Sequence, residues 1–225
     1  MIIAVEGADK AGKHTQVVKT VNYMQEHGIP TETIDFPQYD TPIGKEIQKV
    51  LNGEIVLSAE ESMELFAKNR EEQMPQINEW IQAGKWVLFD RFSYSNVAYY
   101  AAKHPQFQWQ EKIAMVENIE FNKHRICRPD LNIYLSLPAV VSYEMRNQGL
   151  KPYQNGKPDI NERNLLLQQN VADVYKMIAA RDPKNWVVVN EIKPDGTRMN
   201  PDEVFASLRP IFDKMILQHR NGRTK

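Results

Sequence analysis

A glycine-rich segment near the start of the chain carries the clearest chemical signal. Gly7 and Gly12 bracket the sequence GADKAGK in the spacing G-x-x-x-x-G-K, with the small residue Ala11 before the second glycine and Lys13 at the end. Glycines at this spacing let several backbone N–H groups converge on one point, and the start of a following helix adds positive potential. The pattern predicts a phosphate-binding loop (P-loop) in which Lys13 reaches the outer phosphates of ATP.

The residues that follow the lysine depart from the usual P-loop pattern. His14 stands where a serine or threonine hydroxyl normally binds Mg²⁺, and Thr15 comes one place later. An imidazole is a poor ligand for this ion because Mg²⁺ prefers oxygen. We therefore expect other groups to hold the metal, with Asp9 inside the loop as the first candidate.

A second pair of charged residues follows an apolar run in the middle of the chain. Asp90 and Arg91 come directly after the sequence WVLF. If that run is a strand of a parallel sheet, its carboxyl end lies at the edge where ligands bind in doubly wound folds. A local ion pair is the alternative explanation, but the position favours a role for Arg91 in the site.

Short apolar runs and longer helical patterns alternate along the whole chain. The runs that we expect to form strands are 2–5, 32–36, 86–89, 131–135 and 186–189. The sequences WVLF and WVVV are continuously apolar, which is typical of strands that helices cover on both faces. The alternation predicts an α/β fold with a five-stranded parallel sheet flanked by helices on both faces.

Two helix starts can be located from their capping residues. Ser58 with Glu61 forms the pattern of a capping box ahead of a long helical stretch. Asn200 followed by Pro201 and two acids is a second start, because proline is favoured at the first helical position.

Composition excludes several classes of protein. The chain has 225 residues and a net charge of −1, with 28 Lys and Arg against 29 Asp and Glu, which argues against nucleic-acid binding through bulk charge. No apolar run approaches the roughly 20 residues of a membrane span. One cysteine and five scattered histidines predict neither a disulfide nor a zinc cluster. The first residues lack the features of a signal peptide, so we expect a cytoplasmic protein, in the host cytoplasm if a virus encodes it.

Five blocks of sequence together resemble the thymidylate kinase family of P-loop nucleoside monophosphate kinases. They are IAVEGADKAGKHTQ at 3–16, FPQY at 36–39, FAKNR at 66–70, DRFSYSNVAYY at 90–100 and RPDLNIYL at 128–135. The resemblance implies a P-loop kinase fold in a single domain over residues 1–225, with a lid at about 144–162. It also implies ATP and deoxythymidine monophosphate (dTMP) as substrates, Mg²⁺ as cofactor and a homodimer.

The resemblance also implies which residues bind the base and sugar of dTMP. Phe66 would stack on the thymine and Arg70 would reach its exocyclic oxygen; the two are four apart on one predicted helix and so share a face. Phe36–Pro37 would form a wall beside the base and its methyl group. Asn96 would bond the pyrimidine edge, and the bulk of Tyr99 beside C2′ would disfavour ribonucleotides.

The same resemblance implies roles around the phosphates. Arg91 would lie between the donor and acceptor phosphates, and Asp9 would lie near the sugar 3′-hydroxyl and the Mg²⁺ shell. Lys10 occupies a position that holds a catalytic arginine in one subgroup and glycine in another, where the lid supplies the arginine. The lid segment here contains Arg146, which we assign to the adenine face, and three further basic residues whose roles stay open: Lys151, Lys157 and Arg163.

Two positions fit the family pattern incompletely. Many relatives carry an arginine at the place of Tyr39 to bind the acceptor phosphate, and others pair a tyrosine with a preceding basic residue, whereas Gln38 precedes it here. This difference leaves room for dUMP or 5-substituted analogues as substrates. Glu162 matches a glutamate that organises Mg²⁺, through water, and the sugar, with Gln154 as the alternative match.

Three other functions stay open at this stage. The chain could phosphorylate a different nucleoside monophosphate, act as a regulatory P-loop ATPase, or be a relative that has lost activity. The combined base-site residues argue against the first alternative, and the DR-x-x-x-S block argues against the second. The third conflicts with the presence of Lys13 and Arg91, which phosphoryl transfer requires.

Overall fold

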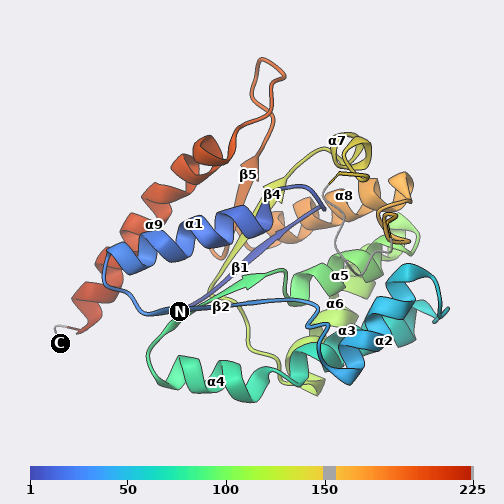
Figure 1. Ribbon diagram of the computed structural model, residues 1–225, viewed down its shortest axis with the longest axis horizontal. Coiled ribbons are helices and arrows are strands. Elements are labelled where there is room, and N and C mark those ends of the chain that lie inside the picture. The colour runs from blue at the N-terminus through green and yellow to red at the C-terminus, as the bar shows by residue number, and fades with distance from the viewer. Residues whose placement is uncertain (149–155, 224–225) are drawn as a thin grey trace.

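A five-stranded parallel sheet lies at the centre of the molecule, with helices on both faces (Figure 1). The structure is a computed structural model that describes residues 1–148 and 156–223. The strands are β1 (Ile2–Gly7), β2 (Thr31–Asp35), β3 (Trp86–Asp90), β4 (Leu131–Ser136) and β5 (Trp186–Asn190). They lie in the order β2-β3-β1-β4-β5, and every neighbouring pair is parallel. The predicted five-stranded α/β sheet is confirmed.

Alternate side chains of the inner strands point to opposite faces, so each face has its own core. Ile3 and Val5 of β1 pack with α1 (Lys13–Glu26) and α9 (Pro201–Arg223). Ile2 and Ala4 pack instead with α3 (Ala59–Glu71) and α4 (Met74–Gln82).

On this second face, further helices continue the layer over β4 and β5. These are α5 (Ser93–Ala102), α6 (Trp109–Asn118) and α8 (Leu165–Arg181), which share a core with Tyr134 and Trp186.

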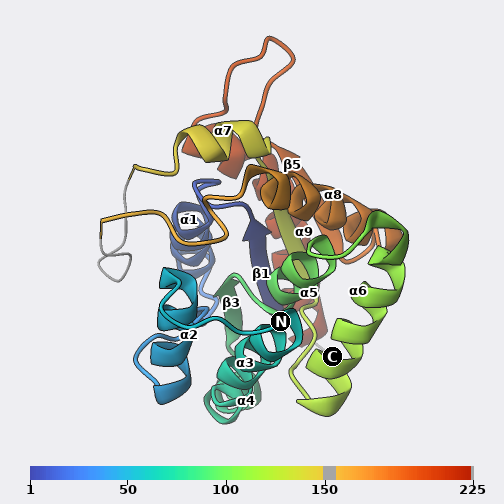
Figure 2. The same ribbon diagram turned by 90° about the vertical axis from the view of Figure 1, so that its right-hand side faces the viewer.

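The remaining elements are short or lie at the rim of the sheet. They are α2 (Pro42–Asn52), α7 (Ala139–Glu144), a 3₁₀ turn η1 (Gln106–Gln108) and a π-helical turn η2 (Ile119–Lys123). The connection between β5 and α9 projects from the body of the molecule (Figure 2). Among the described residues, we find no helix that is both long and apolar enough to cross a membrane.

Both predicted helix starts are confirmed. Ser58 and Glu61 form a reciprocal capping box before α3, with the Ser58 hydroxyl accepting from the Glu61 N–H at 3.1 Å and the Glu61 carboxylate accepting from the Ser58 N–H at 2.8 Å. Asn200 Oδ1 accepts from the backbone N–H groups of Asp202 and Glu203 at the start of α9.

The two continuously apolar strands differ in how completely they are buried. The run WVVV is covered on both faces as predicted, because Trp186 packs with α8 on one face and Val187 and Val189 pack with α9 on the other. It forms β5, however, which lies at the edge of the sheet and pairs with β4. Val188 is 44% exposed as a result, whereas the residues Trp86–Phe89 of β3 are all buried as predicted. Apolar character reports the preference of a strand for burial, and only the topology decides how many neighbours it has.

The register of the sheet brings three loops to one edge. Val5 of β1 lies opposite Asp90 of β3, which lies opposite Asp35 of β2. The segments that follow these residues therefore begin side by side at the carboxyl ends of the strands. They are the P-loop, the Asp90–Arg91 turn and the Phe36–Tyr39 segment.

Candidate active site

The predicted P-loop links β1 to α1 through a tightly bent backbone. A side chain at Gly7 would come within 2.7 Å of the Leu135 carbonyl oxygen on β4, so the first glycine is needed for close strand packing. Gly12 has a left-handed φ of 73° at the N-cap of α1, and Lys10 has a φ of 66°. Glycine adopts this conformation most readily, which accords with glycine at the position of Lys10 in one subgroup of the family.

Lys13 folds back across the loop. Its Nζ donates to the Ala8 carbonyl at 2.8 Å and lies 4.0 Å from Asp9 Oδ1, and the side chain is only 7% exposed. The ammonium is therefore held within the curl of the loop that the sequence predicted to bind phosphate.

Two distant side chains tether the outside of the loop. Ser142 of α7 donates to the Asp9 carbonyl at 2.7 Å, and Arg198 donates to the Lys10 carbonyl at 2.6 Å. Arg198 also pairs with Glu191 at the end of β5 at 2.7 Å. No sequence motif marks these tethers, because they come from segments 133 and 188 residues away in the chain.

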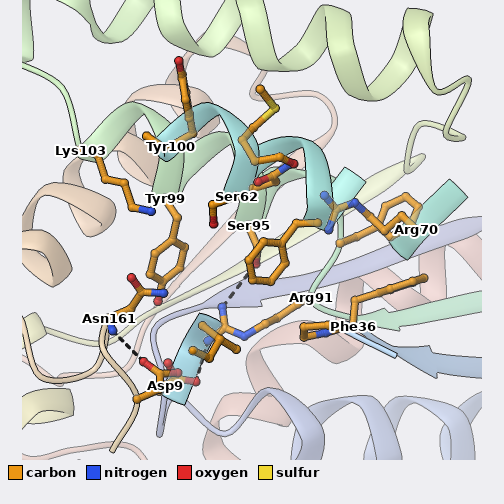
Figure 3. A pocket seen from close by; sticks show the side chains of 18 of the residues that line it. Asp9, Phe36, Ser62, Arg70, Arg91, Ser95, Tyr99, Tyr100, Lys103 and Asn161 are labelled. Atoms are coloured by element: carbon orange, nitrogen blue, oxygen red, sulfur yellow. Dashed lines mark hydrogen bonds and ion pairs between the residues drawn. The ribbon is translucent and has the colours of Figure 1, made fainter. Parts of the chain in front are cut away.

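Arg91 pairs with the P-loop across the edge of the sheet. Its Nη2 donates to Asp9 Oδ1 at 2.7 Å, its Nη1 lies 3.3 Å from Ser95 Oγ, and its φ is 64° (Figure 3). Burial alone would lower the pKa of Arg91, but the adjacent Asp9 carboxylate outweighs that effect and raises this pKa well above its usual value. The guanidinium is thus a permanent positive charge beside the loop.

A buried carboxylate supports the turn that carries Arg91. Glu6 has no exposed surface and accepts from the Phe92 N–H at 2.9 Å, the Ser95 hydroxyl at 2.5 Å and the Tyr175 hydroxyl at 2.8 Å. Burial raises the pKa of Glu6, and the three hydrogen bonds limit that increase. The hydrogen bonds of Glu6 therefore connect β1 to the start of α5 and to α8, behind the Asp9–Arg91 pair.

One cavity runs from the Asp9–Arg91 pair to the side chains of α3 that face it (Figure 3). It unites most of the predicted substrate-binding residues. Those that line it are Asp9, Phe36, Pro37, Tyr39, Phe66, Arg70, Arg91, Asn96 and Tyr99. Residues from the P-loop and from α3 and α5 thus meet in a single space.

At the end of the cavity away from the P-loop, Arg70 and Asn96 both bind one carboxylate, which no sequence motif marks. Arg70 forms a two-point ion pair with Glu120 of η2, through Nε at 2.9 Å and through Nη2. Asn96 Nδ2 donates to the same carboxylate at 2.6 Å. No local signal marks Glu120, which stands 50 residues from Arg70 and on a turn of irregular helix.

Tyr99 of α5 lines the cavity near the Asp9–Arg91 pair, with its ring centre 6.0 Å from the Arg91 guanidinium. Its hydroxyl is 3.5 Å from Gln168 Oε1 on α8, the outer limit of a hydrogen bond. Burial, reinforced by the negative charge of Asp9, raises the pKa of Tyr99 well above its usual value. The phenol is therefore a neutral, bulky group at neutral pH.

The side chain of Gln38, which precedes Tyr39, bonds to Asp35 and does not line the cavity. Its amide donates to the carbonyl and the carboxylate of Asp35, at 2.6 and 3.0 Å, and it is not among the side chains that line the cavity. Buried Asn69 holds the Gln38 backbone from both sides, accepting from its N–H at 2.8 Å and donating to its carbonyl at 3.0 Å. The Gln38 side chain therefore has no direct contact with the cavity, and tolerance of dUMP or 5-substituted analogues stays a prediction.

The described part of the lid segment contributes carboxylates beside the P-loop. Glu162 is buried, lies 4.0 Å from the Lys10 ammonium and accepts from the Asp159 N–H at 3.0 Å. Burial, together with the charges of Asp9 and Glu162, raises the pKa of Asp159 from 3.8 to about 7. The alternative match Gln154 lies outside the described residues, as does Lys151.

Besides Lys10, Lys13 and Glu162, three further predicted nucleotide-binding side chains lie outside the cavity. Arg146 stacks on the ring of Tyr143 at 3.8 Å and donates to the carbonyl of that residue. His14 is 81% exposed with Nδ1 3.7 Å from Asp90 Oδ2, and Thr15 is exposed at the start of α1. Their contacts with ATP stay predictions.

Oxygen ligands for a metal ion are present but dispersed. Within residues 1–148 and 156–223, no three His, Cys, Asp or Glu side chains are arranged as a ready-made metal site. Mg²⁺ typically binds one or two carboxylates together with substrate phosphates and waters. Asp9 and Glu162 fit such a shared site, because both carboxylates lie close enough to Asp159 to add to the effect of burial on its pKa.

Comparison with known proteins agrees with this geometry. A family model described as Thymidylate kinase matches residues 5–196. A thymidylate kinase from Mycobacterium tuberculosis is 31% identical over 216 residues, which cover 93% of this chain and 98% of that protein. A relative from Invertebrate iridescent virus 6 is 36% identical over 136 residues, a match that spans 60% of each chain.

A solved structure gives the same result for the fold. The thymidylate kinase from Candida albicans superposes with a TM-score of 0.73 at 25% identity, covering 95% of this chain and 91% of that one. The P-loop kinase fold is therefore confirmed. Because the family model spans most of the sequence, the chain belongs to the thymidylate kinase family.

Proposed function

We propose that this chain transfers the γ-phosphoryl group of ATP to the phosphate of dTMP, giving ADP and dTDP. The observation that carries the proposal is the Asp9–Arg91 pair at 2.7 Å, because it joins the P-loop to the cavity that Phe66, Arg70 and Asn96 line. A nucleotide held by those side chains would direct its phosphate toward the P-loop. The family membership of the chain supports the same reaction.

The chemistry requires charge neutralisation more than a nucleophile. Both substrates are anions, and the acceptor phosphate oxygen is already negative near neutral pH, so no strong base is needed. Lys13 and Arg91 would hold the two phosphates in line and offset their repulsion, with the loop N–H groups completing the cradle. Lys10 would add positive charge from the P-loop, with Glu162 fixing its direction.

The opposite end of the cavity would recognise the nucleoside. We assign Phe66 to the face of the thymine, Arg70 and Asn96 to its edge, and Phe36–Pro37 to the wall beside its methyl group. Tyr99 would restrict the space beside C2′ and so favour deoxyribose. All of these residues line the one cavity, which supports their assignment to a single ligand.

The remaining assignments concern Mg²⁺ and the phosphate donor, ATP. Asp9 and, through water, Glu162 would hold Mg²⁺. When bound, this ion supplies positive charge that neutralises the phosphates of ATP. Arg146 would cover the adenine, His14 and Thr15 would lie near the donor phosphates, and Tyr39 would assist the acceptor phosphate.

We extend the proposal to the organisation of the enzyme. A lid at about 144–162 within one domain, a homodimer and a cytoplasmic location all follow from the family resemblance.

ADP release from Mg-ATP with a panel of acceptors tests the proposal. The panel is dTMP, dUMP, 5-hydroxymethyl-dUMP, ribothymidine monophosphate, dCMP, dGMP and AMP. We expect high turnover with dTMP and little with the ribose, cytosine and purine compounds, and the two uracil compounds measure how strongly the methyl group is required. ADP release that ignores the acceptor would instead indicate a regulatory ATPase.

A further inference from the structure

One buried carboxylate holds the side chains of Arg70 and Asn96 at the end of the cavity that would bind the base, and no sequence motif marks it. Glu120 has no exposed surface and accepts three hydrogen bonds, two from Arg70 and one from Asn96. Arg70 is itself 2% exposed. A buried carboxylate is costly unless it is paired and fully hydrogen-bonded, so its partners are held firmly in place.

Glu120 leaves the amide of Asn96 only one orientation. The Nδ2 of Asn96 lies 2.6 Å from Glu120 Oε1 and 2.9 Å from the Met63 carbonyl oxygen, and both of these atoms can only accept hydrogen bonds. The reverse orientation would place Oδ1 against two acceptors. Both Nδ2 hydrogens therefore point into the protein, and Oδ1, which has no hydrogen-bond partner in residues 1–148 and 156–223, is the atom left for a ligand in the cavity.

The pairing with Glu120 also leaves some N–H groups of Arg70 available to a ligand. A guanidinium has five N–H groups, and Glu120 takes one from Nε and one from Nη2. The described part of the chain provides no partner for the remaining N–H groups of Arg70. Because Arg70 lines the cavity, these groups can donate to a ligand there. An acceptor on Asn96 and donors on Arg70 are thus fixed around one end of the same space.

We propose that Glu120 is a positioning residue that sets this hydrogen-bonding polarity and thereby selects pyrimidines with a carbonyl at C4 over pyrimidines with an amino group there. The inference rests on the proposed function, because it deepens the assignment of Arg70 and Asn96 to the base. A 4-oxo pyrimidine offers an N3–H donor and an O4 acceptor, which complement the two side chains. Cytosine offers an N3 acceptor and an N4 amino donor, so both contacts would be reversed.

The turn that carries Glu120 is fastened to the helix that carries Arg70. His124, which follows η2, has Nδ1 2.8 Å from Glu71 Oε2 and Nε2 2.8 Å from Glu64 Oε1, and both glutamates belong to α3. Lys123 also donates to Glu64 at 2.6 Å. These contacts hold η2 against α3 without touching Arg70 or Asn96, so they provide a control that separates general stability from base recognition.

The decisive variant is Glu120→Gln, which keeps the shape of the side chain. Its amide would set an NH₂ group against a donor of either Arg70 or Asn96, so at least one contact is lost. Equilibrium binding of dTMP, dUMP and dCMP, measured by calorimetry, should show dTMP and dUMP weakened by about tenfold to a hundredfold. The preference for dTMP over dCMP should narrow by about tenfold, with the KM for ATP unchanged, and Glu120→Asp, which keeps the charge, should give intermediate values.

Glu64→Gln is the matched control. It removes the negative charge that pairs with Lys123 and contacts His124, so it should lower the melting temperature and keep the wild-type preference for dTMP over dCMP. A folded Glu120→Gln protein with the wild-type preference would overturn the inference, as would an equal loss of preference in Glu64→Gln.

Binding also separates this inference from the proposed function. A wild-type protein that binds dTMP better than dCMP but transfers no phosphate would contradict the proposed function and keep the inference. A wild-type protein with no preference between the two would overturn the inference, whether or not it transfers phosphate.

Discussion

The cavity has a phosphate end at the Asp9–Arg91 pair and a base end at Arg70 and Asn96, and the two ends hold their charged side chains in different ways. At the phosphate end, Asp9 is 30% exposed and Arg91 is 16% exposed, and their positions depend on left-handed backbone at Lys10, Gly12 and Arg91. At the base end, Glu120 and Arg70 are almost completely buried and are held by side-chain contacts between distant helices.

This difference matches what each end has to do. Under the proposed function, an incoming phosphate would compete with Asp9 for Arg91 and Lys13, and partial exposure makes such ion pairs easy to exchange. Breaking a buried pair such as Arg70–Glu120 would leave an uncompensated charge. We therefore expect the base end to be fixed before the substrate binds and the phosphate end to rearrange around it.

Removing a cation from the phosphate end should have the largest effect. In Arg91→Ala or Lys13→Ala, we expect kcat to fall by roughly a thousandfold or more, because the transferred phosphoryl group loses its main source of positive charge. The melting temperature should change little, since neither side chain supports the core. Steady-state kinetics with thermal unfolding checks both statements. Arg181→Ala, which breaks only an exposed pair with Glu117, is the control, and a folded Arg91→Ala enzyme with near-normal turnover would refute the role of Arg91.

Gly44→Ala should damage the wall beside the base while leaving the phosphate end intact. A side chain at Gly44 would overlap the Gln38 carbonyl and come within 2.7 Å of the Tyr39 Cα, so the Phe36–Tyr39 segment must move. We expect the free energy of unfolding to fall by about 1–3 kcal/mol and the KM for dTMP to rise several-fold, with the KM for ATP unchanged.

The neighbouring substitution Lys45→Ala controls for helix propensity. Lys45 is exposed on the first turn of α2, where alanine is a good helix former. If Gly44→Ala is as stable as Lys45→Ala and binds dTMP normally, the close approach at Gly44 does not shape the wall.

The phosphate end is also the part that sequence reasoning could predict well. The P-loop is a run of consecutive residues, and the Asp90–Arg91 pair follows directly from a strand that its apolar residues mark. Parallel register then brings the two together, because carboxyl ends of parallel strands meet at one edge. These signals predict that both segments lie at one edge of the sheet, but the ion pair between Arg91 and Asp9 is visible only in the structure, where β3 lies next to β1.

The base end could be predicted only in part. The spacing of Phe66 and Arg70 places them on one helical face, but nothing local points to Glu120 as the partner of Arg70. Its inward direction depends on a π-helical turn, which alters the usual spacing along α6, and on the packing of η2 against α3. The tethers from Ser142 and Arg198 to the P-loop escaped prediction for the same reason, since long-range contacts of single polar residues leave no periodic pattern.

Substitutions at Tyr99 should give a smaller and more selective effect. The phenol hydroxyl is only at the limit of bonding with Gln168, so Tyr99→Phe should retain the preference for deoxyribose. Tyr99→Ala opens space beside the sugar, and we expect the ratio of kcat/KM for dTMP over the ribonucleotide to narrow by about tenfold. Kinetics on both acceptors with both variants tests this, and an equal loss of preference in Tyr99→Phe would assign selectivity to the hydroxyl.

The smallest expected effect concerns the pH dependence of stability through Glu6. Because burial raises the pKa of Glu6 above 4.5 in the folded protein, the folded state holds a proton at pH values where the unfolded chain has lost it. The free energy of unfolding therefore falls as the pH rises from the unfolded pKa through the folded one. Glu6→Gln cannot ionise and lacks this contribution.

Thermal unfolding from pH 4 to pH 8, without nucleotide or metal, measures the difference. The amide of Glu6→Gln can still accept from the Phe92 N–H and can donate to the hydroxyls of Ser95 and Tyr175, so the fold should be retained. We expect its melting temperature to rise relative to the wild type by about 2–4 °C between the two ends of the range. Parallel curves for the two proteins would mean that Glu6 stays ionised throughout. In that case the three hydrogen bonds that Glu6 accepts would outweigh the effect of burial on its pKa.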